Sequence, residues 1–230
     1  MWKRGCSLRR RQRGQPITSH RTLAIDCATA ACSVALFEGE RLLSAAHEVL
    51  GRGHAERLVP MIADLPEKGR ADTILVSLGP GSFTGVRIGI ATARALGFAW
   101  QAEVLGYPTL ALVAAMARAD DSQAPVTVCM NGGHGEWFVQ DFDAAGMPQG
   151  QVASLPPEAA AARDFHAIVA GDRAAELVGD APDAKHRAAA ILPDARATPL
   201  LPKTLLTQDL APIYGRGPDA TPSAIAEAGR

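Results

Sequence analysis

Short apolar segments separated by glycine-containing and charged turns fill the first hundred residues. Their alternation predicts three strands joined by tight turns, over residues 23–26, 32–37 and 41–49. Apolar residues at helical spacing, Leu58, Met61, Ile62 and Leu65, predict a helix over 54–65, which Pro60 either kinks or starts. A buried strand over 73–78 and a long helix over 85–100 follow.

The second half of the chain repeats this order in outline. A short connection at 105–108 leads to a helix over 109–118 and a polar link at 120–123. Strands at 126–130 and 137–140 enclose a glycine-rich turn, and helix and strand patterns then alternate over 158–163, 167–170, 173–178 and 188–192. Prolines make the last thirty residues irregular. The fold class predicted is α/β, with two similar subdomains, 22–106 and 107–230, that each open with a β-meander. This is the actin-like or Hsp70-like ATPase (ASKHA) architecture.

Composition and charge place the chain among globular proteins. It is 47% hydrophobic and 20% charged, and no apolar run reaches the length of a membrane-spanning helix. Residues 1–21 carry seven basic residues and no acid, whereas the remainder has a net charge of −8. This segment predicts a disordered, dispensable extension, with nucleic-acid binding as the alternative. The four cysteines form no metal-type pair, so we expect free thiols in a reducing cytoplasm.

The segment Gly79–Arg87 joins the buried strand to the long helix, as in loops that bind anions. A Walker A loop is excluded because no lysine lies between Lys68 and Lys185. A dinucleotide fingerprint fits poorly because Thr84 stands where the third glycine belongs. Small residues recur every four positions, at Gly85, Gly89, Ala93 and Gly97. This small-residue stripe predicts close packing, either on the domain's own sheet or on a partner helix.

Residues that could carry chemistry are few. In actin-like ATPases an aspartate at the end of the first strand helps to hold the metal–nucleotide complex, and Asp26, Thr29 and Ser33 form a candidate vestigial nucleotide site here. The turn between them lacks glycine, and Asn131 stands where the second half would need an aspartate. His54 is followed one turn later by Leu58, so no His-x₃-His pair is available. We therefore expect no catalytic residues, no metal and no cofactor.

Three segments, 22–37, 54–65 and 77–97, resemble the TsaB (YeaZ) family, above all through the string GPGSFTGVRIG. The resemblance implies a non-catalytic dimerisation subunit of the bacterial machinery that makes N6-threonylcarbamoyladenosine at position 37 of tRNAs reading ANN codons. It implies an inactive paralogue of the catalytic subunit TsaD, with which it forms a heterodimer on which the ATPase TsaE docks. A homodimer in the absence of TsaD, contact with tRNA only through the complex, a cytoplasmic location and no membrane association are also implied.

Carried over residue by residue, the resemblance places the partner interface on two helices and favours a partner helix over the small-residue stripe. The residues are His54, Glu56, Arg57, Leu58, Met61, Ile62 and Leu65 on the first helix, and Gly85, Arg87, Ile88, Gly89, Ala91, Thr92 and Ala95 on the second. The family's Asp-Ala-Arg-like turn is replaced here by Asn131-Gly132-Gly133, which weakens a nucleotide site further. The alternative function is a stand-alone nucleotide-binding protein or acyltransferase of the same fold.

Overall fold

The computed structural model describes residues 20–119, 123–179 and 185–216. Most of the predicted basic extension therefore lies outside the described residues, and its dispensability stays a prediction. Its last residue, Arg21, already belongs to the first strand, and the Arg21 guanidinium lies 2.8 Å from the Glu67 carboxylate. Order thus begins before Thr22, and the boundary of the extension moves towards the N-terminus.

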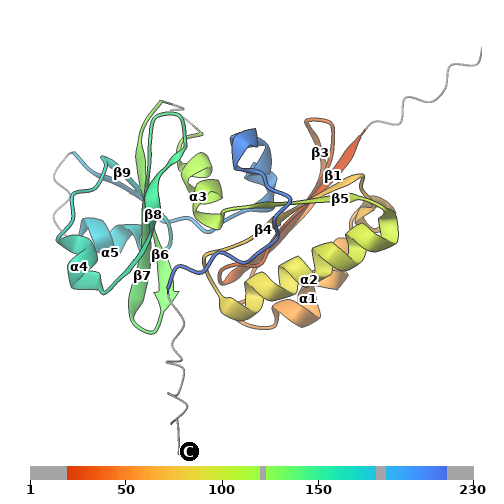
Figure 1. The fold of residues 1–230 in the computed structure, drawn as a ribbon, viewed down its shortest axis with the longest axis horizontal. Coiled ribbons are helices and arrows are strands. Elements are labelled where there is room, and N and C mark those ends of the chain that lie inside the picture. The colour runs from red at the N-terminus through yellow and green to blue at the C-terminus, as the bar shows by residue number, and fades with distance from the viewer. Residues whose placement is uncertain (1–19, 120–122, 180–184, 217–230) are drawn as a thin grey trace, which may run out of the picture.

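The first half is a five-stranded mixed sheet with the strand order β3-β2-β1-β4-β5. Strands β1 to β3 form an antiparallel meander. Strand β4 pairs with β1 in parallel, and β5 pairs with β4 in parallel. The strands are β1 (Arg21–Asp26), β2 (Ala31–Glu38), β3 (Arg41–Val49), β4 (Thr73–Ser77) and β5 (Glu103–Tyr107). Two helices, α1 (His54–Ala63) and α2 (Phe83–Trp100), lie together on one face of this sheet (Figure 1).

The second half repeats the topology, with the strand order β10-β9-β6-β7-β8. Strands β6 to β8 form an antiparallel meander. Strand β9 pairs with β6 in parallel, and β10 pairs with β9 in parallel. The strands are β6 (Val126–Gly133), β7 (Glu136–Phe142), β8 (Pro148–Leu155), β9 (Ile168–Ala170) and β10 (Arg187–Ala189). The helices are α3 (Thr109–Ala117), α4 (Pro157–Ala161) and α5 (Ala174–Val178). The repeated topology confirms the predicted α/β fold with two similar halves of actin-like type.

Two strands differ from the sequence prediction. Residues 105–108 were expected to be a short connection, but Glu103–Tyr107 forms the edge strand β5 of the first sheet. Strand β8, which completes the second meander, was not predicted as a separate element. Helix α1 starts at His54, so Pro60 lies inside the helix and does not mark its start.

Helix α3 lies between the two sheets and is buried along almost its whole length (Figure 1). Its apolar residues pack on both sheets, from Phe37 and Leu75 of the first to Val128 and Phe142 of the second. The chain then returns to the first half. The Ala195 N–H donates to Ser33 Oγ at 3.0 Å, Thr207 pairs with Gly106, and the Ile213 N–H donates to the Leu78 carbonyl at 2.8 Å. We call residues 207–216 the strap. No helix within the described part of the chain is long and apolar enough to span a membrane.

Candidate functional site

The predicted interface residues on α1 divide into a buried and an exposed set. The apolar ones contribute to the core beneath the helix and are at most 5% exposed; they are Leu58, Met61, Ile62 and, just past the helix, Leu65. His54 is also buried, with its Nε2 3.3 Å from the carbonyl oxygen of Ala31. The prediction that these side chains provide apolar area for a partner is wrong, because the chain's own sheet already covers them.

The small-residue stripe of α2 also faces inward. A Cβ at Gly85 would lie 2.0 Å from the carbonyl oxygen of Cys27, and one at Gly97 would lie 2.4 Å from Val104 Cγ2. At Gly89 it would lie 3.6 Å from Val76 Cγ2, and Ala93 is fully buried. The stripe therefore lets α2 approach strands β4 and β5 and the end of β1. The prediction that it packs on a partner helix is wrong.

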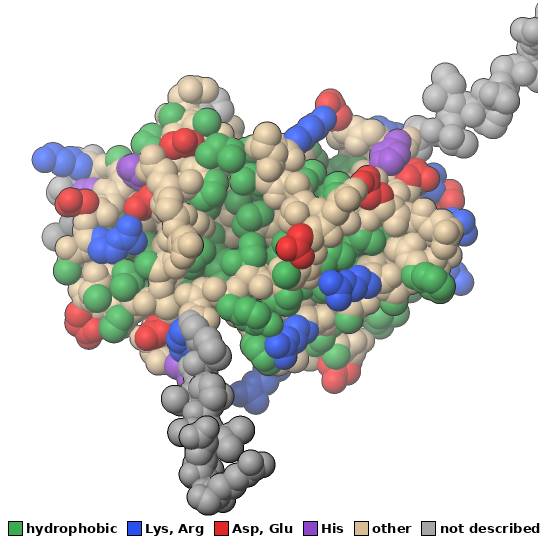
Figure 2. Space-filling view, in the orientation of Figure 1, with side chains coloured by type: hydrophobic (Ala, Val, Ile, Leu, Met, Phe, Trp, Pro, Cys, Tyr) green, Lys and Arg blue, Asp and Glu red, His purple; other side chains and the backbone are tan. Residues whose placement is uncertain are grey.

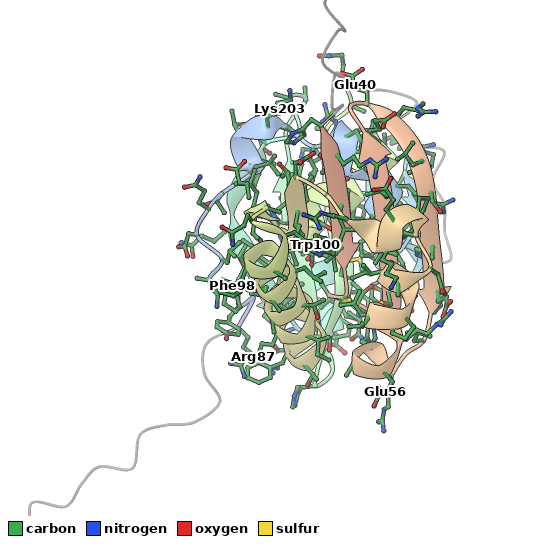
Figure 3. All side chains as sticks on the ribbon, turned by 90° about the vertical axis from the view of Figure 1, so that its right-hand side faces the viewer. Glu40, Glu56, Arg87, Phe98, Trp100 and Lys203 are labelled. Carbon is green, nitrogen blue, oxygen red and sulfur yellow. The ribbon has the colours of Figure 1, made fainter. Side chains whose placement is uncertain are left out.

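The opposite sides of both helices are solvent-exposed and largely apolar. Phe98 on α2 is 83% exposed and Val59 on α1 is 57% exposed. Both helices cover the same face of the sheet (Figure 3), so their outward residues face away from that sheet. We call this surface the outer face; its apolar members are Val59, Ala63, Ile88, Ala91, Ala95 and Phe98.

Charged groups border the outer face. Glu56 and Arg87 are exposed, and Thr92 is half-buried among the apolar residues of α2. Arg57 instead points to the sheet, where its Nε donates to Glu48 Oε2 at 2.7 Å. This hydrogen bond and the charge of Arg57 hold the pKa of the Glu48 carboxyl below its usual range. Arg57 thus ties α1 to strand β3 and has its hydrogen-bonding capacity engaged within the chain.

The candidate nucleotide residues of the first half lie together at the turn between β1 and β2, but two of them are buried. Asp26 is 1% exposed; its Oδ1 accepts from the Ala28 N–H at 3.0 Å and its Oδ2 from the Tyr107 hydroxyl at 3.1 Å. Burial raises the pKa of the Asp26 carboxyl to about 6, although these hydrogen bonds oppose the rise. Ser33 is fully buried and accepts from Ala195. Thr29, in contrast, lines a cavity, and neither Asp26 nor Ser33 is among the residues that line it.

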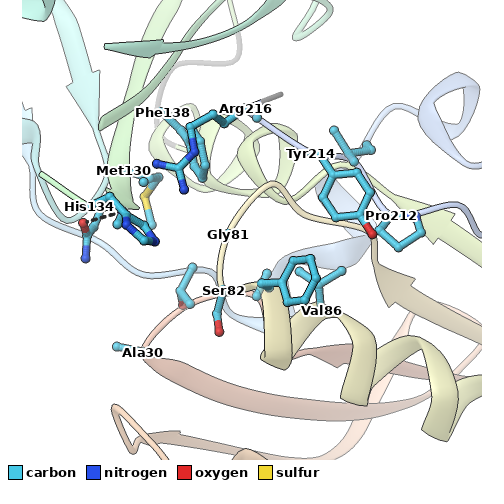
Figure 4. Close-up of a pocket in the computed structure, with 18 of the residues that line it drawn as sticks. Ala30, Gly81, Ser82, Val86, Met130, His134, Phe138, Pro212, Tyr214 and Arg216 are labelled. Carbon is cyan, nitrogen blue, oxygen red and sulfur yellow. Dashed lines mark hydrogen bonds between the residues drawn. The ribbon is translucent and has the colours of Figure 1, made fainter. Parts of the chain in front are cut away.

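That cavity is a cleft of about 780 Å³ between the two halves. One wall is the turn after β1 together with the start of α2, and the opposite wall is the β6–β7 turn with Met130, His134 and Phe138 (Figure 4). The strap closes one side with Pro212, Tyr214 and Arg216. Hydrophobic side chains gather along this seam between the halves (Figure 2). Sequence reasoning missed the cleft because its third wall comes from the irregular C-terminal segment.

The polar groups around the cleft have partners from the chain itself. The Arg87 guanidinium lies 3.5 Å from the centre of the Phe83 ring and donates to the Tyr214 hydroxyl at 2.9 Å. Asp172 accepts from the Asn131 N–H at 2.8 Å, and burial raises the pKa of its carboxyl. Ser82 accepts from the Gly85 N–H and so caps α2. The cleft is therefore an apolar space with a few polar groups at its rim.

A phosphate clamp at the first turn is sterically obstructed. The Ser82 N–H donates to the Ala28 carbonyl at 2.6 Å, and a Cβ at Gly81 would lie 1.9 Å from that same oxygen. The Gly79–Arg87 segment thus packs directly on the turn that would hold phosphates in an actin-like ATPase. Among the described residues no three His, Cys, Asp or Glu side chains gather closely enough to hold a metal ion.

Comparisons with known proteins agree on one family. A family model described as "TsaD: tRNA N6-adenosine threonylcarbamoyltransferase" matches residues 47–152. The chain is 37% identical over 147 residues to the tRNA threonylcarbamoyladenosine biosynthesis protein TsaB of Escherichia coli K12, covering 60% of this chain and 63% of that protein. It is 36% identical over 119 residues to TsaB of Haemophilus influenzae, covering 47% of this chain and 50% of that protein.

A solved structure extends the similarity over nearly the whole described chain. YeaZ from Pseudomonas aeruginosa superposes with a TM-score of 0.69 at 31% sequence identity, covering 85% of this chain and 99% of that one. The curated TsaB relatives match over only one half to two thirds of their own length. The structural match therefore carries the similarity through the second half, where the sequence comparison is weaker.

Proposed function

This chain belongs to the TsaB/YeaZ family, and we propose that it is a non-catalytic subunit of the machinery that makes N6-threonylcarbamoyladenosine at position 37 of tRNAs. In this proposal it binds a TsaD-type catalytic subunit, and TsaE docks on the pair. Contact with tRNA occurs only through the assembled complex, in the cytoplasm. The names of its TsaB relatives support the pathway.

The outer face of α1 and α2 is the observation that carries the proposal. Phe98 and Val59, large apolar side chains on helices that are in contact, are both more than half exposed. Contiguous exposed apolar area of this kind is typical of protein–protein interfaces. Alanines at positions 91 and 95 leave room for a partner helix to approach. We propose that this face, rather than the buried stripe, binds the TsaD-type subunit, or a second copy when that subunit is absent.

The absence of a catalytic role is part of the same proposal. Leu58 lies one turn after His54, at the position where a second histidine would be needed to bind metal on this helix, and both side chains are buried in the core. The candidate nucleotide residues Asp26 and Ser33 form hydrogen bonds within the protein. These arrangements support a scaffold rather than an acyltransferase.

The test is complex formation with the TsaD-type subunit of the same organism, measured by light scattering coupled to size exclusion. We expect a heterodimer with the wild-type chain and a markedly weaker one with Ala91→Arg, since arginine places a charge in the centre of the outer face. A loss of at least tenfold in affinity corresponds to about 1.4 kcal/mol. The thermal midpoint of the variant should stay unchanged because Ala91 is exposed.

Ala159→Arg is the matched control, because Ala159 is an exposed alanine on α4, a helix of the other half (Figure 1). It should bind like the wild type. Equal binding by both variants, or a loss of binding only with Ala159→Arg, would place the interface elsewhere. Failure of the wild-type chain to bind at all would refute the scaffold role itself.

A stand-alone nucleotide-binding protein or acyltransferase is the second candidate, and the cleft between the halves is the observation that favours it. Its position between the β1–β2 and β6–β7 turns is where the two halves of an actin-like ATPase clamp phosphates. The obstructed first turn argues against it. Nucleotide binding by the isolated chain separates the two candidates.

A further inference from the structure

Two cysteines face each other beside the turn that joins β1 to β2. The antiparallel register pairs Asp26 with Ser33, and the next pair in that register is Cys27 with Cys32. Their sulfur atoms are 3.5 Å apart, in hydrogen-bonding contact. Both side chains are buried, Cys27 at 2% and Cys32 at 0% exposure, in the core beneath α1 and α2.

We propose that Cys27 and Cys32 are an oxidisable dithiol, a modification site at which hydrogen peroxide converts the pair to an intrachain disulfide ahead of the remaining buried thiol, Cys129. Residues directly opposite in an antiparallel pair have Cα atoms about 4.5–5.5 Å apart, inside the range that disulfides span. The sulfurs need only approach from 3.5 Å to the bonded distance of about 2.05 Å.

The chemistry uses both thiols and one peroxide. The hydrogen bond with Cys27 lowers the pKa of the Cys32 thiol, so Cys32 is the member of the pair that gives up its proton to become the attacking thiolate. The Cys32 sulfur attacks one peroxide oxygen and the O–O bond breaks. The departing hydroxide takes up the proton that Cys32 had released and becomes water. Cys32 is then a sulfenic acid.

In the second step the Cys27 sulfur attacks the Cys32 sulfur and the S–O bond breaks. The hydroxide leaves with the Cys27 proton as a second water, and the S–S bond forms. Two thiols and one hydrogen peroxide thus give one disulfide and two waters; the sulfurs lose two electrons and the peroxide gains them.

Burial selects the oxidant. Ala30 in the turn that follows Cys27 is exposed, whereas Ala28 and Ala31 are buried. Sulfur atoms covered in this way favour a small oxidant such as hydrogen peroxide over a bulky disulfide reagent. Cys129 lies in the core of the second half, where burial raises the pKa of its thiol to about 12. Cys129 therefore lacks the thiolate character that peroxide needs.

The turn of this hairpin contacts both the helices of the outer face and the cleft. The Cys27 carbonyl is the closest neighbour of Gly85 on α2, and the Ala28 carbonyl accepts from Ser82 at the cleft. The Ala31 carbonyl accepts from His54 at the start of α1. Closing the disulfide would therefore tighten the turn against which both outer-face helices and the cleft are built.

The test uses the full chain with Cys6→Ser and Cys129→Ser, so that the pair supplies the only thiols. The folded protein is treated with hydrogen peroxide, quenched, unfolded, alkylated and weighed. We expect the loss of two hydrogens, no alkylation, a Cys27–Cys32 peptide in the non-reducing digest, and full reversal by dithiothreitol. Cys27→Ser in the same background should instead stop at a sulfenic acid that dimedone traps.

The comparison chain keeps Cys129 and carries Cys6→Ser, Cys27→Ser and Cys32→Ser. Its thiol should stay alkylatable at a peroxide dose that closes the pair. Several results would overturn the proposal: both thiols of the pair remaining free, oxygen addition without disulfide, a disulfide between two chains, or oxidation of Cys129 at the same rate. Circular dichroism of each variant before treatment establishes that folded protein is being oxidised.

Discussion

Two glycines one turn apart on α2 have different surroundings and should respond differently to the same substitution. A Cβ at Gly89 would make ordinary contacts, at 3.6 Å to Val76 and 3.7 Å to Cys27. A Cβ at Gly85 would lie 2.0 Å from the Cys27 carbonyl oxygen. We expect Gly89→Ala to raise the free energy of unfolding by about 0.5–1 kcal/mol through helix propensity. Gly85→Ala should lower it by about 1–3 kcal/mol through overpacking.

Urea unfolding of the two variants beside the wild type measures both effects. The pair acts as its own control, since each substitution adds the same methyl group to the same helix. Equal destabilisation of both variants would mean that Gly89 lies closer to Val76 of β4 than the 3.6 Å contact implies.

Asp26 gives the molecule a stability that depends on pH. Burial raises the pKa of its carboxyl from 3.8 to about 6, so the folded state binds this proton more tightly than the unfolded state. The contribution of this bound proton to the free energy of unfolding is fully present below pH 4 and is lost as the pH rises through 6. Asp26→Asn removes the titration. Its amide can donate to the Tyr107 hydroxyl, which then donates to the Ile25 carbonyl 3.0 Å away.

We therefore expect Asp26→Asn to be more stable than the wild type at pH 7.5, by up to about 3 kcal/mol, and to lose about half of that advantage at pH 5. Thermal unfolding at the two pH values measures it. An advantage of Asp26→Asn that is the same at both pH values would show that the gain does not come from titration.

At the scale of elements, α1 contains a proline where a helix is normally weakened. Pro60 lies in the interior of the helix, is exposed, and has no N–H to donate to the Glu56 carbonyl. Pro60→Ala should raise the free energy of unfolding by about 1–2 kcal/mol, the helix gain being partly offset by a freer unfolded chain.

Pro66 provides the matched control, because it is exposed but begins a 3₁₀ turn, where no N–H is needed. Pro66→Ala should leave the free energy of unfolding unchanged or slightly lower. Denaturant midpoints of both variants test the contrast. A stabilisation by Pro66→Ala as large as that by Pro60→Ala would mean that helix hydrogen bonding is not the cause.

The strongly patterned elements were predictable, and two weakly patterned strands, β5 and β8, were not. Alternation and turn residues predicted strand β3 with its observed bounds, and helical spacing predicted α1 and α2. Strand β5 has a glycine inside it and pairs with only one named strand, β4, and strand β8 begins with Pro148 and is only partly buried. A glycine inside a strand and a proline at its start both weaken the apolar alternation that marks a strand, so these two sequences carry less signal.

The side of a helix that faces the protein is decided by the fold as a whole. The sequence placed a small-residue stripe on α2 but could not tell the chain's own sheet from a partner helix, because both would bury glycines equally well. The same apolar residues of α1 that suggested an interface are the core of the first half. Contacts of the strap, such as Tyr214 with Arg87, join residues 127 positions apart and leave no local pattern.

At the scale of the whole molecule, the two halves meet at a cleft that has the location of a nucleotide site but lacks its means of holding phosphates. Gly81 and Ser82 pack on the Ala28 carbonyl of the first turn, which narrows the space that a phosphate would need there. The guanidinium of Arg87 stacks on Phe83 and binds Tyr214. The residues 131–140 opposite contain no lysine or arginine.

We therefore expect no binding of Mg-ATP or Mg-ADP to the isolated chain. A nucleotide present at about 5 mM and bound with a Kd of about 50 μM would raise the free energy of unfolding by about 2.7 kcal/mol, a shift that thermal unfolding detects easily. The thermal midpoint should instead stay constant across the titration, and Arg87→Ala should behave like the wild type in this respect. Stabilisation by Mg-ATP that Arg87→Ala or Asn131→Ala reduces would show that the turn opens to admit phosphates. In that case the strap, which is joined to α2 through Tyr214 and Arg87, would have to move with it, and the cleft rather than the outer face would be the place to look for function.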